Sequence, residues 1–326
     1  MLSSIELCDK KRIDIEIHSS VLGLGNIDMS TDARVWLVTG ASSGLGRALV
    51  EAVLAKGERT VATVRKPAVL DDLTKKYSSE QLLVLQLDVT DKEAIAQVFT
   101  DIEKHFKRLD VVVNNAGYGV TSDIEATPDE ISRPVFETLF WGPVYITQQA
   151  IRFFREVNPK GLGGRILNIS SIGGYAAQPT LSFYNAAKFA LEGFTQSFTK
   201  EMPPAWNIKG VIVEPGGFAT NWNSNNMITV PSHPAYPDDS PSRQFIQMRE
   251  SVKPIGDVNR AAQAMITISE EPNPPLRLQL GTDAWGIAQG MAQKTIDEGK
   301  KWADLSHSTN LDGYGLEILP FLKGAI

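Results

Sequence analysis

The chain has 326 residues, of which 42% are hydrophobic and 21% are charged, and its formal net charge is −6. This composition is typical of a soluble globular protein that buries a substantial core. The acidic balance argues against binding to nucleic acid or to an anionic membrane surface. No apolar run approaches the ~20 residues that a transmembrane helix needs, so we expect no membrane span.

Cysteine and histidine usage argues against disulfides and metal sites. The single cysteine, Cys8, cannot form an intrachain disulfide and suits a reducing compartment. Residues 1–31 mix charges with isolated aliphatic residues and lack the apolar core of a secretory signal, so we expect a cytoplasmic protein. The histidines lack the spacing of metal ligands, and we expect no metal. They are His18, His105, His233 and His307.

Seven apolar runs have the length and composition of buried strands. They are Val35–Val38, Thr60–Val64, Leu82–Leu87, Val111–Val113, Ile166–Ile169, Val211–Val213 and Leu276–Leu280. Between them, apolar residues recur at helical spacing, as at Leu45, Leu49, Ala52 and Val53. This alternation predicts an α/β fold, a Rossmann-type doubly wound parallel sheet with helices on both faces. Such sheets bind ligands at the carboxyl ends of their strands.

Two segments fall outside the alternation of strands and helices. We expect an N-terminal extension (residues 1–33), one dinucleotide-binding catalytic domain (34–285) and a C-terminal tail (286–326). Within the domain, residues 221–256 are rich in Pro, Asn, Ser and Asp. A loop this long inside a compact domain is usually functional or disordered. Because it follows the sixth expected strand, we interpret it as a substrate lid.

A glycine-rich turn follows the first expected strand. Its candidate cofactor contacts are Gly40, Ser42, Ser43, Gly44, Leu45 and Gly46. Glycine lets the backbone approach a pyrophosphate closely, and the N-terminus of the following helix supplies free N–H groups. A glycine cluster alone is equally often a plain tight turn. Its position at the first strand–helix junction favours a dinucleotide site.

The end of the second expected strand bears on the choice of nicotinamide cofactor. An acidic residue there would bind the ribose 2′-hydroxyl, whereas an arginine would accommodate a 2′-phosphate. The stretch from Arg59 to Leu70 contains no Asp or Glu, and the strand ends in Arg65 and Lys66. A solvated basic pair is the alternative reading. We favour NADP(H).

The third and fourth expected strands also end in candidate cofactor contacts. Asp88 and Val89 end the third strand, where a carboxylate can accept a hydrogen bond from the adenine amino group. Asn115, Ala116 and Gly117 follow the fourth strand, and small residues there let the chain pass close to a cofactor. A simple Asx turn is the alternative reading for each segment.

Tyr184 and Lys188 form a candidate acid–base pair, because residues four apart share one face of a helix. A tyrosine titrates near 10, but a nearby ammonium and an oxidised nicotinamide ring would lower that pKa. Tyr184 could then exchange a proton with a substrate oxygen. Ser171, thirteen residues before Tyr184, could hydrogen-bond the same oxygen, and its neighbour Ser170 is the rival serine.

With these motifs in consistent order over residues 33–285, the chain resembles the short-chain dehydrogenase/reductase family, most closely its hydroxysteroid- and retinol-dehydrogenase-like branch. By this resemblance, Lys188 also holds the nicotinamide ribose, and Asn115–Gly117 flank that ribose. Pro215 and Gly216, with Phe218 and Thr220 after them, would complete the cofactor site, Thr220 at the carboxamide. The resemblance also implies a homodimer or homotetramer that packs helices around 136–156 and 180–200 across a two-fold axis.

Leu139 departs from the family pattern, which usually has asparagine at this place. In the family, that asparagine helps to hold a water that links the active-site lysine to solvent. Leucine cannot hydrogen-bond, so the proton relay must run through other groups or be weakened. Our leading interpretation is a rerouted relay, and the alternative is a chain whose redox turnover is lost or diverted.

Aromatic and apolar residues near strand ends and in the expected lid are candidate pocket residues. They are Tyr118, Trp141, Tyr175, Phe183, Phe218, Trp222 and Met227. Such residues are more often ordinary core, but an apolar cleft suits a bulky hydrophobic ketone, aldehyde or alcohol. We therefore expect an NADP(H)-dependent oxidoreductase with Tyr184 as its acid–base residue. The alternatives are a non-redox isomerisation or cyclisation and a non-catalytic regulatory protein that kept the fold.

Overall fold

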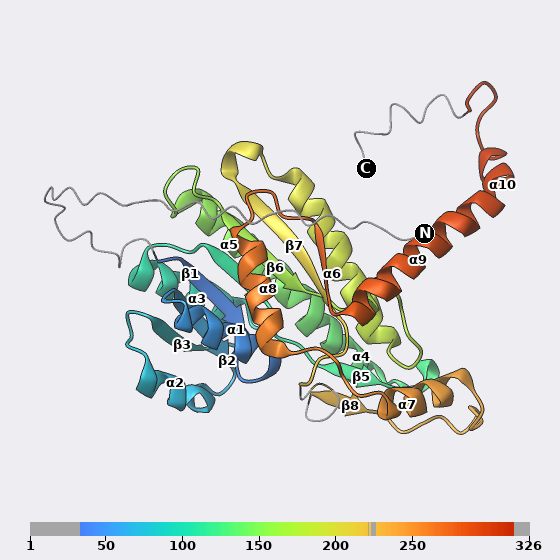
Figure 1. The fold of residues 1–326 in the computed structure, drawn as a ribbon, viewed down its shortest axis with the longest axis horizontal. Coiled ribbons are helices and arrows are strands. Elements are labelled where there is room, and N and C mark those ends of the chain that lie inside the picture. The colour runs from blue at the N-terminus through green and yellow to red at the C-terminus, as the bar shows by residue number, and fades with distance from the viewer. Residues whose placement is uncertain (1–32, 221, 223–225, 316–326) are drawn as a thin grey trace, which may run out of the picture. The chain divides into compact units, whose positions relative to one another are not determined.

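The computed structural model describes residues 33–220, 222 and 226–315, and its centre is a seven-stranded sheet in which every neighbouring pair is parallel (Figure 1). The strand order is β3-β2-β1-β4-β6-β7-β9. The bounds are β1 Val35–Thr39, β2 Arg59–Val64, β3 Leu82–Gln86, β4 Val111–Asn114, β6 Gly164–Ile169, β7 Ile208–Pro215 and β9 Arg277–Leu280. All seven expected strands are present, and the predicted fold class is confirmed.

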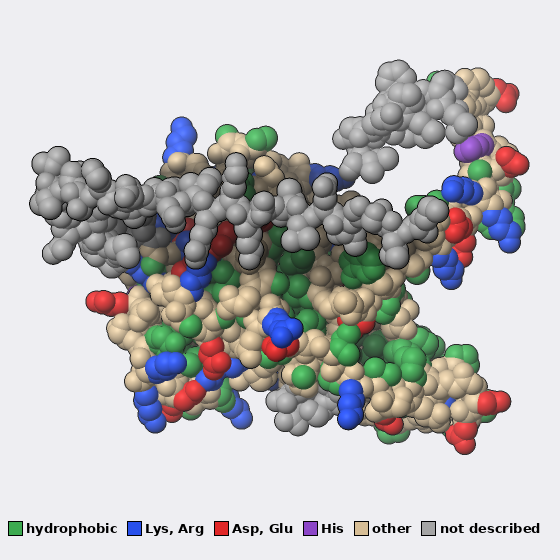
Figure 2. Space-filling model, in the orientation of Figure 1, with side chains coloured by type: hydrophobic (Ala, Val, Ile, Leu, Met, Phe, Trp, Pro, Cys, Tyr) green, Lys and Arg blue, Asp and Glu red, His purple; other side chains and the backbone are tan. Residues whose placement is uncertain are grey.

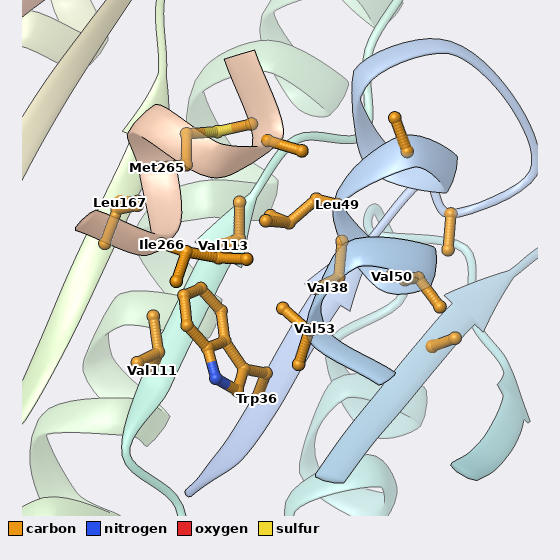
Figure 3. Packing of buried hydrophobic residues seen from close by; sticks show 14 of the residues in the cluster. Trp36, Val38, Leu49, Val50, Val53, Val111, Val113, Leu167, Met265 and Ile266 are labelled. Atoms are coloured by element: carbon orange, nitrogen blue, oxygen red, sulfur yellow. The ribbon is translucent and has the colours of Figure 1, made fainter. Parts of the chain in front are cut away.

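Helices cover both faces of the sheet because its strands are apolar on both sides. One face packs against α1 (Gly44–Ala55), α2 (Asp71–Lys76) and α8 (Val258–Glu270). Figure 3 shows this side, where Trp36 and Val38 of β1 meet Leu49 of α1 and Met265 of α8. Val35 and Leu37 point to the opposite face. That face packs against α3 (Lys92–Phe106), α5 (Gly142–Glu156) and α6 (Ser182–Glu201).

The strand order places a ligand crevice between β1 and β4. From β1 the chain moves outward through β2 to β3, and from β4 it moves outward in the other direction. The connections that leave β1 and β4 therefore cover opposite faces of the sheet. In folds of this kind, ligands bind beyond the carboxyl ends of the two strands. The glycine turn follows β1, and Asn115–Gly117 follow β4. The topology brings these two predicted motifs together.

The segment expected to be a lid contains regular structure that the sequence did not reveal. It holds β8 (Met227–Thr229) and α7 (Pro241–Ser251). β8 pairs in parallel with β5 (Gly119–Thr121), beside α4 (Asp129–Phe136), at the carboxyl end of the main sheet (Figure 1). Strands of three residues are too short to show a periodic pattern. The described part of the segment therefore contains a strand and a helix rather than loop alone.

The expected tail also begins inside a helix. The expected boundary at residue 285 falls within α9 (Thr282–Lys301), which α10 (Ala303–His307) follows. In α9 only Ala284 and Ala288 are buried. In the part of the chain that the structure describes, no helix is long and apolar enough to cross a membrane. Residues 1–32, including Cys8 and most of the expected N-terminal extension, lie outside the described residues.

Five short helical turns complete the described chain. They are η1 Pro67–Leu70, η2 Ile124–Ala126, η3 Glu137–Trp141, η4 Ile172–Gly174 and η5 Pro204–Trp206. Of these, η3 is a single π-helical turn between α4 and α5. Turns of this kind occur frequently at functional sites. On the face of the described chain seen in Figure 2, acidic and basic side chains are interspersed, and apolar side chains gather beside the lid.

Candidate active site

The glycine turn forms a cradle that a side chain would fill. Gly40 and Gly44 have φ angles of +65° and +58°, a backbone region that favours glycine. A Cβ on Gly40 would lie 2.7 Å from the Cα of Ala116, and one on Gly46 would lie 2.6 Å from the carbonyl oxygen of Gly40. Ser43 precedes α1 without a capping bond from its side chain. This cradle at a helix N-terminus fits a pyrophosphate.

Asn115 joins the ends of β1 and β4. Its side-chain amide donates to the carbonyl oxygens of Thr39 at 2.8 Å and Gly40 at 3.2 Å. The backbone N–H groups of Asn115 and Ala116 both donate to the Thr39 hydroxyl at 3.0 Å. Asn115 therefore holds the glycine turn in place, and Ala116 and Gly117 form the adjoining wall of the crevice.

The expected adenosine contacts lie beyond the ends of β2 and β3. Arg65 and Lys66 are exposed. Asp88 accepts hydrogen bonds from the backbone N–H and hydroxyl of Thr90, at 3.0 and 2.8 Å, so it forms the Asx turn that the sequence left open. Burial raises the pKa of Tyr118, a hydrogen bond from Thr138 opposes this shift, and the charges of Arg65 and Asp88 also act on it. Arg65 and Asp88 therefore lie within electrostatic reach of Tyr118.

The loop after β7 completes the cofactor side of the crevice. The methyl group of Thr220 would lie 3.3 Å from a Cβ on Gly44, so Thr220 reaches the glycine turn. Pro215 ends β7, and the N–H of Gly216 donates to Leu280. Phe218 forms a bridge with Gly256, and its ring covers that glycine. Phe218 therefore packs against the C-terminal end of the expected lid segment.

Ser171, Tyr184 and Lys188 converge at the start of α6. The Ser171 hydroxyl lies within reach of the Tyr184 hydroxyl, where it can stabilise the phenolate. The Lys188 ammonium lies 5.8 Å from the centre of the Tyr184 ring and donates to the carbonyl oxygen of Ile169 at 2.7 Å. Tyr184 and Lys188 are almost fully buried, at 7% and 6% exposure. The three side chains that the sequence proposed for catalysis form one group.

Burial controls the ionisation of this group. It raises the pKa of Tyr184 to about 12, although the hydrogen bond with Ser171 opposes the shift. Burial also lowers the pKa of Lys188 to about 8, and the charge of Glu192 opposes that shift. The sequence predicted a lowered pKa for Tyr184. In the chain itself, the loss of hydration outweighs the effect of Ser171, and the phenol is protonated at neutral pH.

The structure separates the two candidate serines. Ser170 is buried, and its hydroxyl donates to Glu192 at 2.6 Å. Ser171 points toward Tyr184 and accepts the Gly173 N–H at 3.0 Å. Successive side chains of an extended strand point to opposite faces, so only one of two neighbouring serines can face the phenol.

Leu139 is part of the apolar wall beside Tyr184. It is 1% exposed, lies in η3, and packs in one cluster with Val120, Leu181 and Tyr184. A Cβ on Gly117 would lie 2.7 Å from Leu139 Cδ2, so Leu139 also lies against the turn after β4. The position that usually carries an amide is therefore occupied by a closely packed aliphatic side chain.

The expected pocket residues divide into two groups. Tyr118, Trp222 and Met227 pack against the cluster of Leu139 and Tyr184, and the Trp222 ring lies 5.4 Å from the Tyr184 ring. The structure does not bring the others into this cluster. Trp141 is 40% exposed and stacks on Tyr145, Tyr175 lies under Arg277, Phe183 is half-exposed, and Phe218 packs at the base of the lid.

Sequence reasoning missed four charged residues around the site. Glu192 and Asp283 adjoin the catalytic group and the β7 loop, and the Asp283 carboxylate accepts the Gly217 N–H at 2.7 Å. Asp123 and Arg243 form an ion pair at 3.1 Å between the core and the lid. The four-residue step from Lys188 could have indicated Glu192. Asp283, Asp123 and Arg243 make their contacts with segments that are far away in the sequence, so no local pattern could have indicated them.

Comparison with known proteins assigns the family. Residues 34–229 match the family model described as short chain dehydrogenase. The chain belongs to this family. It is 40% identical over 278 residues to an uncharacterized oxidoreductase of Schizosaccharomyces pombe, covering 85% of this chain and 92% of that protein. The family is one of NAD(P)(H)-dependent oxidoreductases, and this chain has the expected cradle for such a cofactor.

Two further comparisons support the same assignment. A short-chain dehydrogenase from Streptomyces avermitilis has a crystal structure that matches with a TM-score of 0.78 and 37% identity, covering 86% of this chain and all of that chain. A 3-ketodihydrosphingosine reductase of Bacteroides thetaiotaomicron is 31% identical over 250 residues, covering 76% of this chain and 88% of that protein. Within the described residues, no group of His, Cys, Asp and Glu side chains could hold a metal ion.

Proposed function

We propose that the protein is an NADP(H)-dependent reductase of a hydrophobic ketone or aldehyde. The observation that carries this proposal is that Tyr184 is buried in an apolar cluster beside Lys188 and within reach of the Ser171 hydroxyl. A protonated phenol in such a place is a proton donor for a carbonyl oxygen. Because the phenol is protonated at neutral pH, it can donate the proton that carbonyl reduction requires.

The chain's own groups account for binding, orientation and proton transfer. When bound, the nicotinamide supplies two electrons and one hydrogen to the carbonyl carbon. Tyr184 donates the proton to the carbonyl oxygen, and Ser171 donates a hydrogen bond to the same oxygen as negative charge develops on it. Lys188 would hold the ribose and favour the phenolate that remains. The glycine cradle and the N-terminus of α1 would hold the pyrophosphate.

The lining of the site suggests the substrate class. Trp222 and Met227 of the lid pack with Leu139 and Tyr184, and this wall is apolar. Such surroundings suit a bulky hydrophobic carbonyl compound rather than a sugar or a hydroxy acid. The relative described as a 3-ketodihydrosphingosine reductase agrees with a hydrophobic ketone. The hydroxysteroid- and retinol-dehydrogenase-like branch belongs to the same proposal, as does a cytoplasmic location.

The test of this function is the Tyr184→Phe variant, assayed by NADPH oxidation with a panel of hydrophobic ketones and aldehydes. The substitution keeps the ring packing and removes the transferable proton. We expect NADPH binding to persist while turnover falls by about 10²–10⁴. Tyr77→Phe, on the far side of the core, is the matched control and should turn over normally. Near-normal turnover of Tyr184→Phe would reject the mechanism.

Cofactor preference rests on Arg65 and Lys66, since no carboxylate lies between them and the start of β2. A charge-assisted contact contributes on the order of 1.5–3 kcal/mol. Arg65→Ala should therefore weaken NADPH binding about ten-fold or more and leave NADH binding nearly unchanged. Arg59→Ala, at the opposite end of β2, is the control and should change neither affinity. Equal losses for both cofactors would rule out this assignment.

The leucine at position 139 favours one alternative function. In this function, a diverted reaction, the bound cofactor serves an isomerisation or cyclisation without net redox change. The observation is the apolar packing at a place where the family usually has an amide. Product analysis distinguishes the two candidates. Substrate conversion without NADPH consumption would support the diverted reaction, and a non-catalytic role would show NADPH binding without conversion of any compound.

We also propose that the protein is a homodimer or homotetramer. The helices that would pack across a two-fold axis, α5 and α6, adjoin or carry exposed aromatic side chains. Trp141, which precedes α5, and Phe189 on α6 are 40% and 45% exposed. Aromatic residues are enriched at protein interfaces. Packing of α6 against a second copy would steady the helix that carries Tyr184 and Lys188.

A further inference from the structure

A buried cluster of charged side chains lies one helical turn beyond Lys188 on α6. Glu192 is 3% exposed and accepts hydrogen bonds from Ser170 Oγ at 2.6 Å and from Arg277 Nη1 of β9 at 2.5 Å. The same guanidinium donates to Glu214 of β7, whose side chain is fully buried, at 3.1 Å. The cluster joins the catalytic helix to two strands at the edge of the sheet.

The cluster is electrically balanced when every member is ionised. Lys188 and Arg277 supply two positive charges, and Glu192 and Glu214 supply two negative charges. A buried charge is costly unless an opposite charge compensates it. The negative charge of Glu192 opposes the effect of burial on Lys188, so the ammonium has a carboxylate one turn away on its own helix. The loss of any one member leaves a net charge inside the protein.

Local packing is built to bring these groups together. Gly174 follows the catalytic serine, and any side chain there would collide with Ser170 Oγ and Glu192 Oε1. On β9, Gln279 donates to Glu214 at 2.6 Å and satisfies its second oxygen. The Tyr175 ring lies 5.5 Å from the Arg277 guanidinium.

Charged and polar groups face Glu192 from its own helix, from two strands of the sheet and from the end of a third. They are Lys188 on α6, Ser170 after β6, Glu214 on β7 and Arg277 on β9. Asp283 of α9 instead accepts the N–H of Gly217.

We infer that Glu192 is a positioning residue, which keeps the buried Lys188 side chain charged through this balanced cluster. The role of Lys188 in turnover rests on the proposed function, whereas its ionisation does not. Burial raises the pKa of Glu192 to about 7, with Glu214 acting in the same direction and Ser170 and Arg277 against it. Burial thus moves the pKa values of both Lys188 and Glu192 toward neutral pH, to about 8 and about 7.

The test follows the Lys188 Cε resonance by NMR of protein labelled with ¹³C-lysine, assigned from its absence in Lys188→Met. In the wild type, the resonance should titrate in two steps, near pH 7 and pH 8. In Glu192→Gln, the lysine keeps its burial and loses the opposing charge. Its midpoint should fall by about one pH unit or more. Glu214→Gln removes the carboxylate on the other side of Arg277, so it should lower the midpoint in the same direction by less than Glu192→Gln does.

A double variant separates charge balance from a structural role. Glu192→Gln with Arg277→Gln removes one negative and one positive charge, so the Lys188 midpoint should return toward the wild-type value. An unchanged midpoint in folded Glu192→Gln, or no return in the double variant, would overturn the inference. If the variants do not fold, the wild-type titration still tests the inference. A single step of Lys188 near the ordinary lysine pKa of about 10.4 would overturn the inference.

The titration needs neither substrate nor cofactor, and therefore the inference and the proposed function can fail separately. Loss of reductase activity in every assay would reject the function and leave the Lys188 titration intact. If both hold, the midpoint of the pH profile of kcat should move with the Lys188 resonance in Glu192→Gln. A profile that stays in place while the resonance moves would show that Lys188 ionisation does not control turnover.

Discussion

At the scale of single residues, Ser170 and Ser171 follow the same strand and make different contacts. Ser171 pairs with Tyr184, and Ser170 donates to Glu192. The sequence preferred Ser171 for its spacing, and the pleat of an extended chain supplies the physical reason. The two neighbouring serines thus lie between Tyr184 and the buried charged cluster around Glu192.

Leu139 allows a test of the proton relay, because it departs from the family pattern and is closely packed. Its side chain is buried among apolar neighbours, so Leu139→Asn should lower the free energy of unfolding by roughly 1–3 kcal/mol if the amide finds no partner. If an asparagine here completes a proton relay, the reductase rate should be preserved or raised, most visibly at high pH. The measurements are NADPH oxidation from pH 6 to pH 10 and denaturant unfolding.

Leu139→Met is the matched control, because it keeps the volume and apolar character of the site and should change stability by less than about 1.5 kcal/mol. A Leu139→Asn variant that folds, binds NADPH and turns over more slowly at every pH would show a site rebuilt around an apolar group. That result would favour the diverted reaction.

At the scale of elements, residues 226–256, which we propose as a substrate lid, are fastened at their base and near their middle. At the base, the N–H of Gly256 donates to Gly217 at 2.8 Å. Near the middle, Asp123 accepts the His233 N–H at 2.9 Å and pairs with Arg243 of α7 at 3.1 Å. Burial raises the pKa of Asp123, but hydrogen bonds from His233 and Ser242 and the charge of Arg243 more than offset this, so its pKa is lowered. The carboxylate therefore stays ionised at neutral pH and ties α7 to the core.

We expect Arg243→Met to loosen the lid, because it leaves the fully buried Asp123 carboxylate without its cation. Breaking a buried pair costs about 3–5 kcal/mol. Amide hydrogen exchange in β8 should become faster by on the order of 100-fold or more, and KM for the hydrophobic substrate should rise while NADPH affinity changes little.

The control for the lid is Arg260→Met on α8, where the side chain is 91% exposed and lies 4.0 Å from Asp257. An exposed pair of this kind contributes little, so exchange in β8 should match the wild type. Unchanged exchange in Arg243→Met as well would show that the ion pair does not hold the lid.

At the scale of the whole molecule, the outer faces of α5 and α6 bear on assembly. Phe189 is 45% exposed in the single chain, and Phe189→Asp puts a carboxylate at this position. Burying that carboxylate at an interface would be costly. The wild type should sediment as a dimer or tetramer at micromolar concentration, and this variant as a monomer. Val69→Asp, with 46% exposure on another part of the surface, should assemble like the wild type. A wild type that is only monomeric would contradict the proposal.

Much of the fold and part of the site could be predicted because their signals are local. The seven strands read as continuous apolar runs, since a parallel sheet is covered on both faces. The Gly40–Gly46 turn and the Tyr184–Lys188 pair were visible because turn chemistry and helical spacing act over a few residues. β5 and β8 were missed, since three residues carry no period.

The sequence by itself determined the sheet, the glycine turn and the spacing of Tyr184 and Lys188, because each depends on interactions within one strand, turn or helix. Only the tertiary structure decided which serine faces the phenol, that Trp141 lies outside the cluster around Tyr184, and that Glu192 meets Arg277 and Ser170. These outcomes depend on segments brought together by packing, and burial then sets the charge of every group that the packing encloses.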